Sequence, residues 1–586
     1  MEKVYMNREM GDGLLLLRTY MDTIQSTKDP DTKSQPENSF AERLLQEHRC
    51  KKHSEVQSSD FAVDNYDAAV RGHDAVEIQW SPPYGRYLVA ARDIDAGEVI
   101  LREKPLLIVP RINSEPTCLA CMKPLGKDWE GCNLCGGPLC SPHCAGTYHG
   151  KKECILICRI GIKNSQNIES CIKQLNILLG PLRVLLMFQE SPETTELFFA
   201  LQSHEKERRK MHISRFVEEH VVRAMETLLG LEVDSGVVHR VCGVLDTNAF
   251  ELSLDQCRQG RAIFILSSMM NHSCLSNAQR WYSEGNMVVR ASVDISKGTP
   301  LFISYTQSLW GTRARRAHLS VSKMFLCKCK RCLDSTELGS HMSSIPCREC
   351  QGLVVPPDDS CSYWTCTLCG KRIDANATES LVRAGAIAMN HLPKDDTAGA
   401  TLILEHLKRQ LGDNHYIVAQ IKYAVVQAII NRPLKDVTSR DLTRVVTLTK
   451  ELITLATIIE PGITRFRGLL LLEQTRAWSE ILQRCLEAAP ADGGRSLVAG
   501  EGRCVDADEG PNTSDDINHN DELVHHSNNI PSVQMLLSQV AECEYLLQYD
   551  PRLPEVTQLA HNLRLLLKSP AVVQQNLEGA ASKRQG

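Results

Sequence analysis

The spacing of the cysteines constrains the fold of this chain more than any other feature. The sequence holds 24 cysteines among 586 residues, and most fall into three clusters of C-x2-C or C-x-C type. In a large chain without a recognisable secretory signal, such pairs are expected to ligate metal rather than to form disulfides. Thiolates at this spacing suit tetrahedral zinc. We therefore predict a fold built around several structural zinc sites.

The first cluster lies within residues 118–154 and offers eight thiol or imidazole ligands, enough for two zinc ions. The segment is short and rich in Gly and Pro, so metal binding is expected to supply its folding free energy. His143 is an alternative to His149 as the imidazole ligand. The predicted ligands are Cys118, Cys121, Cys132, Cys135, Cys140, Cys144, His149 and Cys154.

The second cluster, C-x-C-x2-C, supplies three thiolates, one short of the four that structural zinc takes. Cys274 is the predicted fourth ligand. It ends an Asn-His-Ser-Cys motif and precedes two strand-like runs, 287–291 and 301–303, the second of which leads to Tyr305. A zinc ion here would bring the motif close to the segment beyond Tyr305. The predicted ligands are Cys274, Cys327, Cys329 and Cys332.

The third cluster consists of two C-x2-C pairs and predicts a fourth zinc ion in a ribbon. Cys361 is a less favoured ligand because it lacks a C-x2-C partner. The predicted ligands are Cys347, Cys350, Cys366 and Cys369.

Composition excludes some classes of function. The chain is 42% hydrophobic and 23% charged, which is ordinary for a globular protein, and its net charge of -5 offers no general basic surface. Direct nucleic-acid binding is therefore not expected. No apolar run is expected to reach the length that spans a bilayer, so no membrane association is predicted.

The motifs together resemble a known family. Asn-His-Ser-Cys, a strand ending at Tyr305 and C-x-C-x2-C, in this order, look like a SET domain with its post-SET zinc site, and the first cluster resembles a MYND finger. A MYND finger inserted ahead of Asn-His-Ser-Cys is the arrangement of the SMYD family of protein-lysine methyltransferases. The additional ribbon and Lys323 are similar to the arthropod-type branch of that family.

The resemblance and the sequence pattern imply an α+β architecture. The expected parts are a SET β-fold with an inserted MYND zinc finger, a post-SET zinc site, an extra zinc ribbon and an α-helical TPR-like C-terminal domain. Apolar residues at i+3 and i+4 spacing from Leu442 to Ile459 predict one of its helices. The expected boundaries are a disordered tail 1–72, the SET N-terminal part 73–117, the finger 118–154, a helical insertion 155–245, the SET core 246–308, post-SET 309–335, the ribbon 336–375 and the helical domain 376–586, with a disordered loop at 490–531.

The function that the resemblance implies is S-adenosylmethionine-dependent methylation of lysine in histone or other protein substrates, with transcriptional regulation as one role. The expected location is cytoplasm and nucleus, the expected state a monomer, and the finger and helical domain are expected to bind protein partners. Tyr305 is the implied catalytic residue. An ordinary turn cap is the alternative for Asn248. The implied cofactor-binding residues are Gly85, Arg86, Asn248, Asn271, His272 and Phe325.

Three departures from the family pattern leave a second function open. Ser276 replaces a proline, Gly298-Thr299-Pro300 replaces an acidic Gly-Glu-Glu, and Lys323 stands where active relatives commonly have tyrosine. A lysine facing the acceptor channel would repel a lysine substrate unless it points outward. The alternative hypothesis is therefore a catalytically weak SET-MYND zinc-binding adaptor protein.

Overall fold

The computed structural model describes residues 73–568, except 83, 127–128, 142–143, 145–148, 255–257, 358–362, 394–395 and 489–530. The predicted tail at 1–72 and nearly all of the predicted loop at 490–531 lie outside the described residues. Backbone contacts divide the chain into two compact units. The first comprises residues 1–306 and 315–327, and the second comprises residues 307–314 and 328–586.

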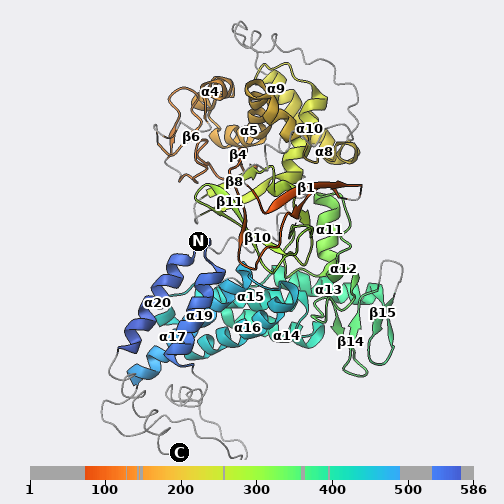
Figure 1. The fold of residues 1–586 in the computed structure, drawn as a ribbon, viewed down its shortest axis with the longest axis vertical. Coiled ribbons are helices and arrows are strands. Elements are labelled where there is room, and N and C mark those ends of the chain that lie inside the picture. The colour runs from red at the N-terminus through yellow and green to blue at the C-terminus, as the bar shows by residue number, and fades with distance from the viewer. Residues whose placement is uncertain are drawn as a thin grey trace, which may run out of the picture. The chain divides into compact units, whose positions relative to one another are not determined.

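The β part of the first unit consists of small sheets (Figure 1). The apolar run predicted at 287–291 lies in a strand whose residues Met287–Ala291 are buried on both faces, and the strands at 76–81 and 99–103 contribute Val76, Ile100 and Leu101 to the same core. The paired strands are β1 Val76–Ser81 with β2 Gly85–Ala90; β10 Ala278–Ser283 with β11 Asn286–Ala291 and β3 Val99–Glu103; β4 Leu107–Pro110 with β8 Arg258–Ile263 and β7 Phe250–Leu254; and β9 Asn271–His272 with β12 Phe302–Ile303.

The finger adds a short antiparallel pair, β5 Glu130–Gly131 with β6 Pro138–Leu139, and helices make up most of the rest of the first unit. Figure 1 shows α5 beside β4, α10 packs against α5, and the apolar residues of α5 from Leu175 onward are largely buried. The helices are α4 Lys151–Cys158, α5 Ile168–Glu190, α6 Pro192–Phe199, α7 Glu205–Arg208, α8 His212–Val217, α9 Arg223–Thr227 and α10 Ser235–Asn248, with a π-helical turn at Glu218–Val222; α11 Thr312–Ser322 follows the strands.

The prediction that no apolar run is long enough to span a bilayer is wrong for one helix. Helix α5 is 23 residues long with a mean hydropathy of 1.4 over its most apolar window, so by length and composition it could cross a bilayer. More than half of that window is buried inside the protein, and Leu175, Leu178 and Leu182 belong to its cores. The apolar length is thus explained by packing, since a core helix passes the same test.

The second unit begins with a small sheet. Its four strands, β13 Ile345–Pro346, β14 Leu353–Val355, β15 Tyr363–Cys366 and β16 Arg372–Asp374, pair antiparallel in sequence order. Of the four cysteines of the predicted ribbon, Cys366 ends β15, Cys347 and Cys350 lie between β13 and β14, and Cys369 lies between β15 and β16. A short helix, α12 Lys330–Leu333, precedes them.

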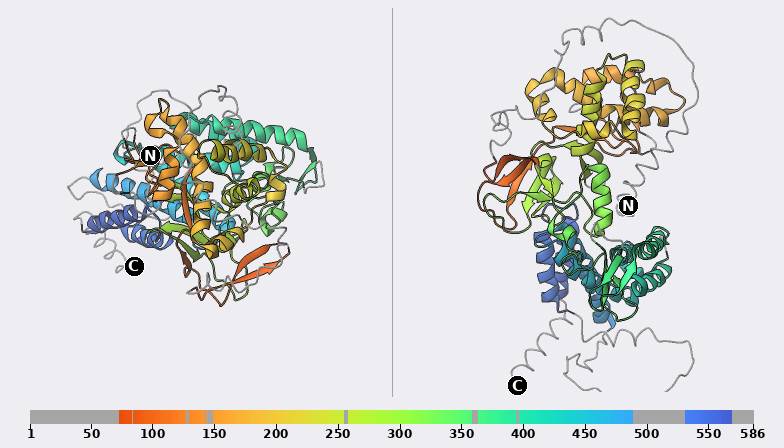
Figure 2. Two further views of the ribbon diagram at one scale, coloured as in Figure 1. Left: turned by 90° about the horizontal axis from the view of Figure 1, so that it is seen from above. Right: turned by 90° about the vertical axis from the view of Figure 1, so that its right-hand side faces the viewer.

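The helices of the second unit, teal to blue in Figure 2, stack side by side, and those from α14 onward each pack against the next. Asp374, Asp396 and Thr438 cap the N-termini of α13, α14 and α16 through side-chain oxygens. These elements confirm the predicted α+β class with a helical C-terminal region. The helices are α13 Ala375–Asn390, α14 Thr397–Leu411, α15 Tyr416–Ile430, α16 Ser439–Ile459, α17 Arg465–Ala488, α19 Val533–Leu546 and α20 Leu553–Leu567.

Candidate functional site

The Asn-His-Ser-Cys motif is held beside the strand that leads to Tyr305. Strand β9 pairs in parallel with β12, so Asn271 lies opposite Phe302 and His272 opposite Ile303. The backbone N–H of Tyr305 donates to His272 Nδ1 at 3.0 Å. Residues separated by more than thirty positions are thus joined by main-chain and side-chain hydrogen bonds. The structure therefore brings His272 and Tyr305 together.

The hydroxyl of Tyr305 has a defined partner. It donates to the carbonyl of Met270 at 2.5 Å, and burial raises the pKa of the phenol above its ordinary value. The group is therefore neutral at physiological pH. Because the hydroxyl proton is donated to a carbonyl, Tyr305 could orient an incoming amine or methyl group through the lone pairs of its oxygen.

Lys323 faces Tyr305 rather than solvent. Its Nζ donates to the carbonyl of Thr247 and lies 5.5 Å from the centroid of the Tyr305 ring. Burial lowers the pKa of this amine to about 8, against the opposing attraction of Asp246. The side chain does not point outward, so the predicted acceptor side of the site contains an amine that belongs to the protein itself.

Gly85 begins β2 with a φ of +64°, a conformation that favours glycine. A Cβ added there would meet no atom within 4 Å, so the backbone of this turn is open to approach by a ligand. The adjacent Arg86 donates from Nη1 to the carbonyl of Ala200 at 3.3 Å. That contact ties the turn to the end of α6.

Asn248 ends α10 and its amide is engaged within the protein. Nδ2 donates to the carbonyls of Val244 and Gln202, both at 2.8 Å. This geometry matches the capping alternative. Contact with a cofactor stays a prediction for Asn248, and any such contact would use its backbone or its side-chain oxygen.

Two further features fit S-adenosylmethionine, the cofactor that the resemblance implies. Nδ2 of Asn271 is buried and, among the described residues, has no hydrogen-bond partner. A buried donor without an acceptor is costly unless a ligand supplies one. Phe325 is partly exposed, with its ring 6.1 Å from that of His272. An unpaired donor, an open glycine turn and an accessible aromatic ring suit a polar, heteroaromatic ligand.

The described residues contain four groups of ligand atoms that could hold a metal ion. Within each group the atoms lie within 4.8 Å of one another, and together the groups contain all sixteen favoured ligands of the sequence analysis. The two less favoured ligands, His143 and Cys361, lie outside the described residues. Thiolate and imidazole donors in sets of four fit closed, structural zinc sites. The groups are Cys118, Cys121, Cys140 and Cys144; Cys132, Cys135, His149 and Cys154; Cys274, Cys327, Cys329 and Cys332; and Cys347, Cys350, Cys366 and Cys369.

A buried carboxylate orients the histidine of the finger. His149 Nε2 lies 3.5 Å from Cys135 Sγ, while its Nδ1 lies 2.9 Å from Glu153 Oε1. Arg183 of α5 binds the same carboxylate and also donates to the carbonyls of Ile108 and Leu119. Glu153 and Arg183 were missed from the sequence. The only signal was the four-residue spacing of His149 and Glu153.

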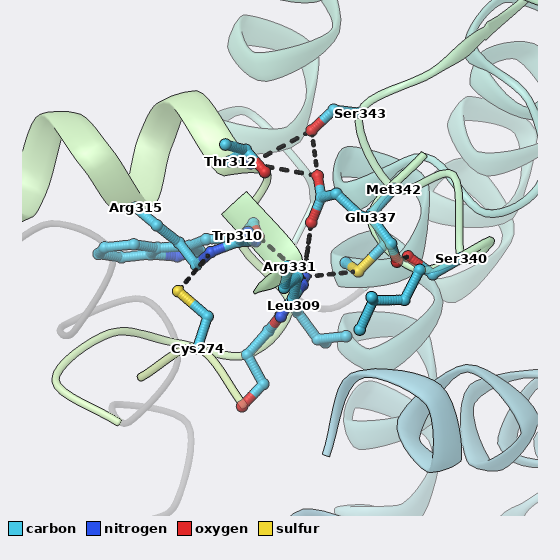
Figure 3. A network of polar contacts seen from close by, with 12 residues as sticks. Cys274, Leu309, Trp310, Thr312, Arg315, Arg331, Glu337, Ser340, Met342 and Ser343 are labelled. Atoms are coloured by element: carbon cyan, nitrogen blue, oxygen red, sulfur yellow. Dashed lines mark hydrogen bonds and ion pairs between the residues drawn. The ribbon is translucent and has the colours of Figure 1, made fainter. Parts of the chain in front are cut away.

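Two buried arginines lie near the second cysteine cluster (Figure 3). In the first unit, Arg315 Nε donates to Cys274 Sγ at 3.2 Å. In the second unit, Arg331 pairs with the fully buried Glu337 at 2.9 Å. That carboxylate also accepts hydrogen bonds from the Thr312 amide and the Ser343 hydroxyl. Arg315 belongs to no recognisable sequence motif, and Arg331 lies inside the C-x-C-x2-C cluster at a position that the motif leaves open.

Comparison with known proteins relates this geometry to a family. A family model described as the SET domain matches residues 85–306. SET domain-containing protein SmydA-8, isoform A, of Drosophila melanogaster is 32% identical over 315 residues, covering 50% of this chain and 64% of the relative. Histone-lysine N-methyltransferase ASHR1 of Arabidopsis thaliana is 30% identical over 266 residues, covering 43% and 53% respectively.

Further similarities are shorter or weaker. Protein-lysine N-trimethyltransferase SMYD5 of Homo sapiens is 34% identical over 80 residues, covering 13% of this chain and 19% of the relative. The solved SET domain of LSMT bound to lysine and AdoHcy is 13% identical, covering 74% of this chain and 97% of that chain, with a TM-score of 0.24, from which we draw nothing. The chain spans less than two thirds of the length of each curated relative named here.

Proposed function

Because this chain is a SET-domain protein of the SMYD family, we propose that it is an S-adenosylmethionine-dependent protein-lysine N-methyltransferase. The observation that carries the proposal is the arrangement of the motif. Tyr305 is hydrogen-bonded through its backbone to His272, next to an Asn271 whose buried amide donor has no partner among the described residues. The site therefore combines a cofactor-binding feature with a positioned hydroxyl.

The bound cofactor would supply an electrophilic methyl group, and the protein's own residues would prepare the acceptor. A lysine amine must be neutral to react, and a poorly hydrated surrounding favours the neutral form. The lone pairs of Tyr305 Oη would accept a hydrogen bond from that amine and align it. Met270 holds the hydroxyl in place from the other side.

The wider assignment follows from the same relationship. We propose lysine residues of histone or other proteins as substrates, binding of protein partners by the finger and the helical region, and residence in cytoplasm and nucleus. Lys323 and the ribbon support placement in the arthropod-type branch.

One observation favours a second function, a zinc-rich adaptor that binds cofactor but transfers methyl groups poorly. Lys323 presents an amine to Tyr305 where a substrate amine would have to approach. If that amine excludes substrates, Lys323→Tyr should restore turnover on added proteins. Cofactor binding without any transfer, relieved by this substitution, would favour the adaptor.

The test of the proposed function is transfer of labelled methyl from S-adenosylmethionine to a broad protein extract. We expect label with the wild-type chain, at least a tenfold loss with Tyr305→Phe, and loss after removal of zinc. Tyr363→Phe, at an exposed tyrosine of the ribbon, is the matched control and should keep full activity. If no label appears although calorimetry detects cofactor binding, the methyltransferase proposal is wrong.

A further inference from the structure

Lys323 has the surroundings of a reacting amine. It follows α11, where its backbone N–H donates to the carbonyl of Leu319 at 2.9 Å, so the side chain starts from a fixed point. Its Nζ then reaches the Thr247 carbonyl, one residue before Asn248, and lies over the Tyr305 ring. The amine is thus next to both the predicted catalytic residue and a predicted cofactor-binding residue.

The carboxylates around Lys323 lie too far away to pair with its ammonium group. Among the described residues, no carboxylate lies within 4 Å of its Nζ, and the nearest acids act only at longer range. Asp246 on α10 is already paired with Arg208 at 2.6 Å and with Arg261 at 3.5 Å. A half-buried ammonium without a paired carboxylate is unfavourable and tends to lose its proton.

The other groups facing Lys323 come from several elements. Glu251 on β7 favours the charged amine, and Arg280 on β10 opposes it. Burial lowers the pKa of His318 on α11 and of His204 before α7, and the positive charge of Lys323 also lowers both. With a pKa of about 8, half of the amine is neutral at pH 8, whereas an ordinary lysine is almost fully charged there.

The hydrogen bond to Thr247 leaves the amine able to react. A neutral amine donates through N–H, so a bond to a backbone carbonyl uses a hydrogen and spares the lone pair. This carbonyl contact also restricts rotation of the Nζ group. The same two features, a neutral amine and a fixed direction, are what methyl transfer requires of a substrate lysine.

We propose that the chain methylates its own Lys323, which makes this residue a modification site and a resident acceptor. The inference rests on the proposed function. The Nζ lone pair forms the new N–C bond to the transferred methyl group, the S–C bond of the cofactor breaks with its electrons on sulfur, and the methylated amine releases a proton to water. Methylation of Lys323 adds apolar bulk beside Tyr305 and thereby changes how the site receives other lysines.

The first experiment incubates the purified full-length chain with S-adenosylmethionine carrying a deuterated methyl group, followed by mass analysis of the peptide that contains Lys323. We expect the mass increase of one or more labelled methyl groups there, at a rate per chain that does not depend on protein concentration. Lys323→Arg removes the increase, Tyr305→Phe reduces it at least tenfold, and Lys297→Arg, at an exposed turn, leaves it unchanged.

The outcomes separate this inference from the proposed function. Label on extract proteins with none on Lys323 overturns self-methylation and leaves the enzyme in place. Absence of label everywhere, with cofactor bound, overturns both. Label on Lys323 that scales with protein concentration overturns transfer within one chain.

A second readout does not depend on turnover. In the protein without cofactor, the rate of acetylation of Lys323 by acetic anhydride, followed by mass analysis against pH, should show a midpoint near 8. A short free peptide containing lysine provides the reference midpoint near 10.4. A Lys323 midpoint equal to that of the peptide would overturn the claim of a reactive resident amine.

Discussion

At the scale of single residues, the structure shows which groups orient the zinc ligands. Burial alone would raise the pKa of Glu153, but Arg183 and His149 outweigh it and hold that pKa below its ordinary value. The charged carboxylate accepts from His149 Nδ1 and so leaves Nε2 free to bind metal. The same contacts explain why His149, next to helix α4, is the imidazole in this group.

We predict that Glu153→Gln weakens zinc binding at this site by about 10- to 100-fold, because a neutral amide polarises the imidazole less. Competition with a chromophoric chelator measures the change. Glu169→Gln is the matched control, since Glu169 is an exposed acid on α5 that pairs with Lys173. Equal zinc affinity in both variants would show that Glu153 does not support the ligand.

Asn271 permits a second prediction at this scale. Asn271→Ala should weaken S-adenosylmethionine binding by about tenfold, in keeping with the loss of one hydrogen bond to a charged ligand. Its effect on the free energy of unfolding should be small, because the amide donor has no partner among the described residues. Calorimetric titration and urea denaturation measure the two effects. Asn286→Ala, at the start of β11, should change neither by a comparable amount. Unchanged cofactor affinity in Asn271→Ala would contradict the assigned role.

At the scale of elements, packing explains which helices were visible in the sequence. The predicted pattern from Leu442 to Ile459 became α16, whose apolar stripe is buried while its other face meets solvent. Helix α15 is buried on nearly every side, so its residues are mostly apolar, apart from Gln420, Lys422 and Gln427, and no stripe stands out. A continuous apolar run does not distinguish a buried helix from a buried strand.

Burial in α17 gives a stability prediction for the second unit. Leu472 is 0% exposed, so Leu472→Ala should lower the free energy of unfolding by about 3 kcal/mol through lost burial and the cavity left behind. Leu402 on α14 is 73% exposed, and Leu402→Ala should cost less than about 0.5 kcal/mol. Urea denaturation followed by circular dichroism compares them. Similar losses in the two variants would contradict the packing of α17.

At the scale of the whole molecule, burial of apolar side chains stabilises some parts of the fold and zinc binding stabilises others. The first unit has its own large apolar cores, as does the second. The finger and the ribbon are different, because their strands are only two to four residues long and their cysteines form part of the buried clusters. Such segments depend on bound metal for their fold.

We therefore predict four zinc ions per chain, one for each group of ligand atoms. Native mass spectrometry and elemental analysis of the full-length chain should agree on this number. Zinc removal should unfold residues 118–154 first, which hydrogen exchange would detect as loss of amide protection there. Fewer than four ions in protein prepared without chelator would mean that at least one group of cysteines is not a zinc site.

The sequence by itself determined the features that depend on neighbouring residues. C-x2-C spacing defines a local turn that points two thiols at one metal, and i+3, i+4 periodicity defines one face of a helix. For this reason the closely spaced cysteine pairs, the strand at 287–291 and helices such as α16 could be predicted before any contact was known.

Only the tertiary structure decided the features that depend on segments distant in sequence. The direction of Lys323 depends on how the end of α11 lies against Thr247 and Tyr305. The partners of Glu153 come from α5, and the lack of a partner for Asn271 Nδ2 depends on everything packed around it. Burial and side-chain direction arise from long-range packing, which local sequence preferences do not specify.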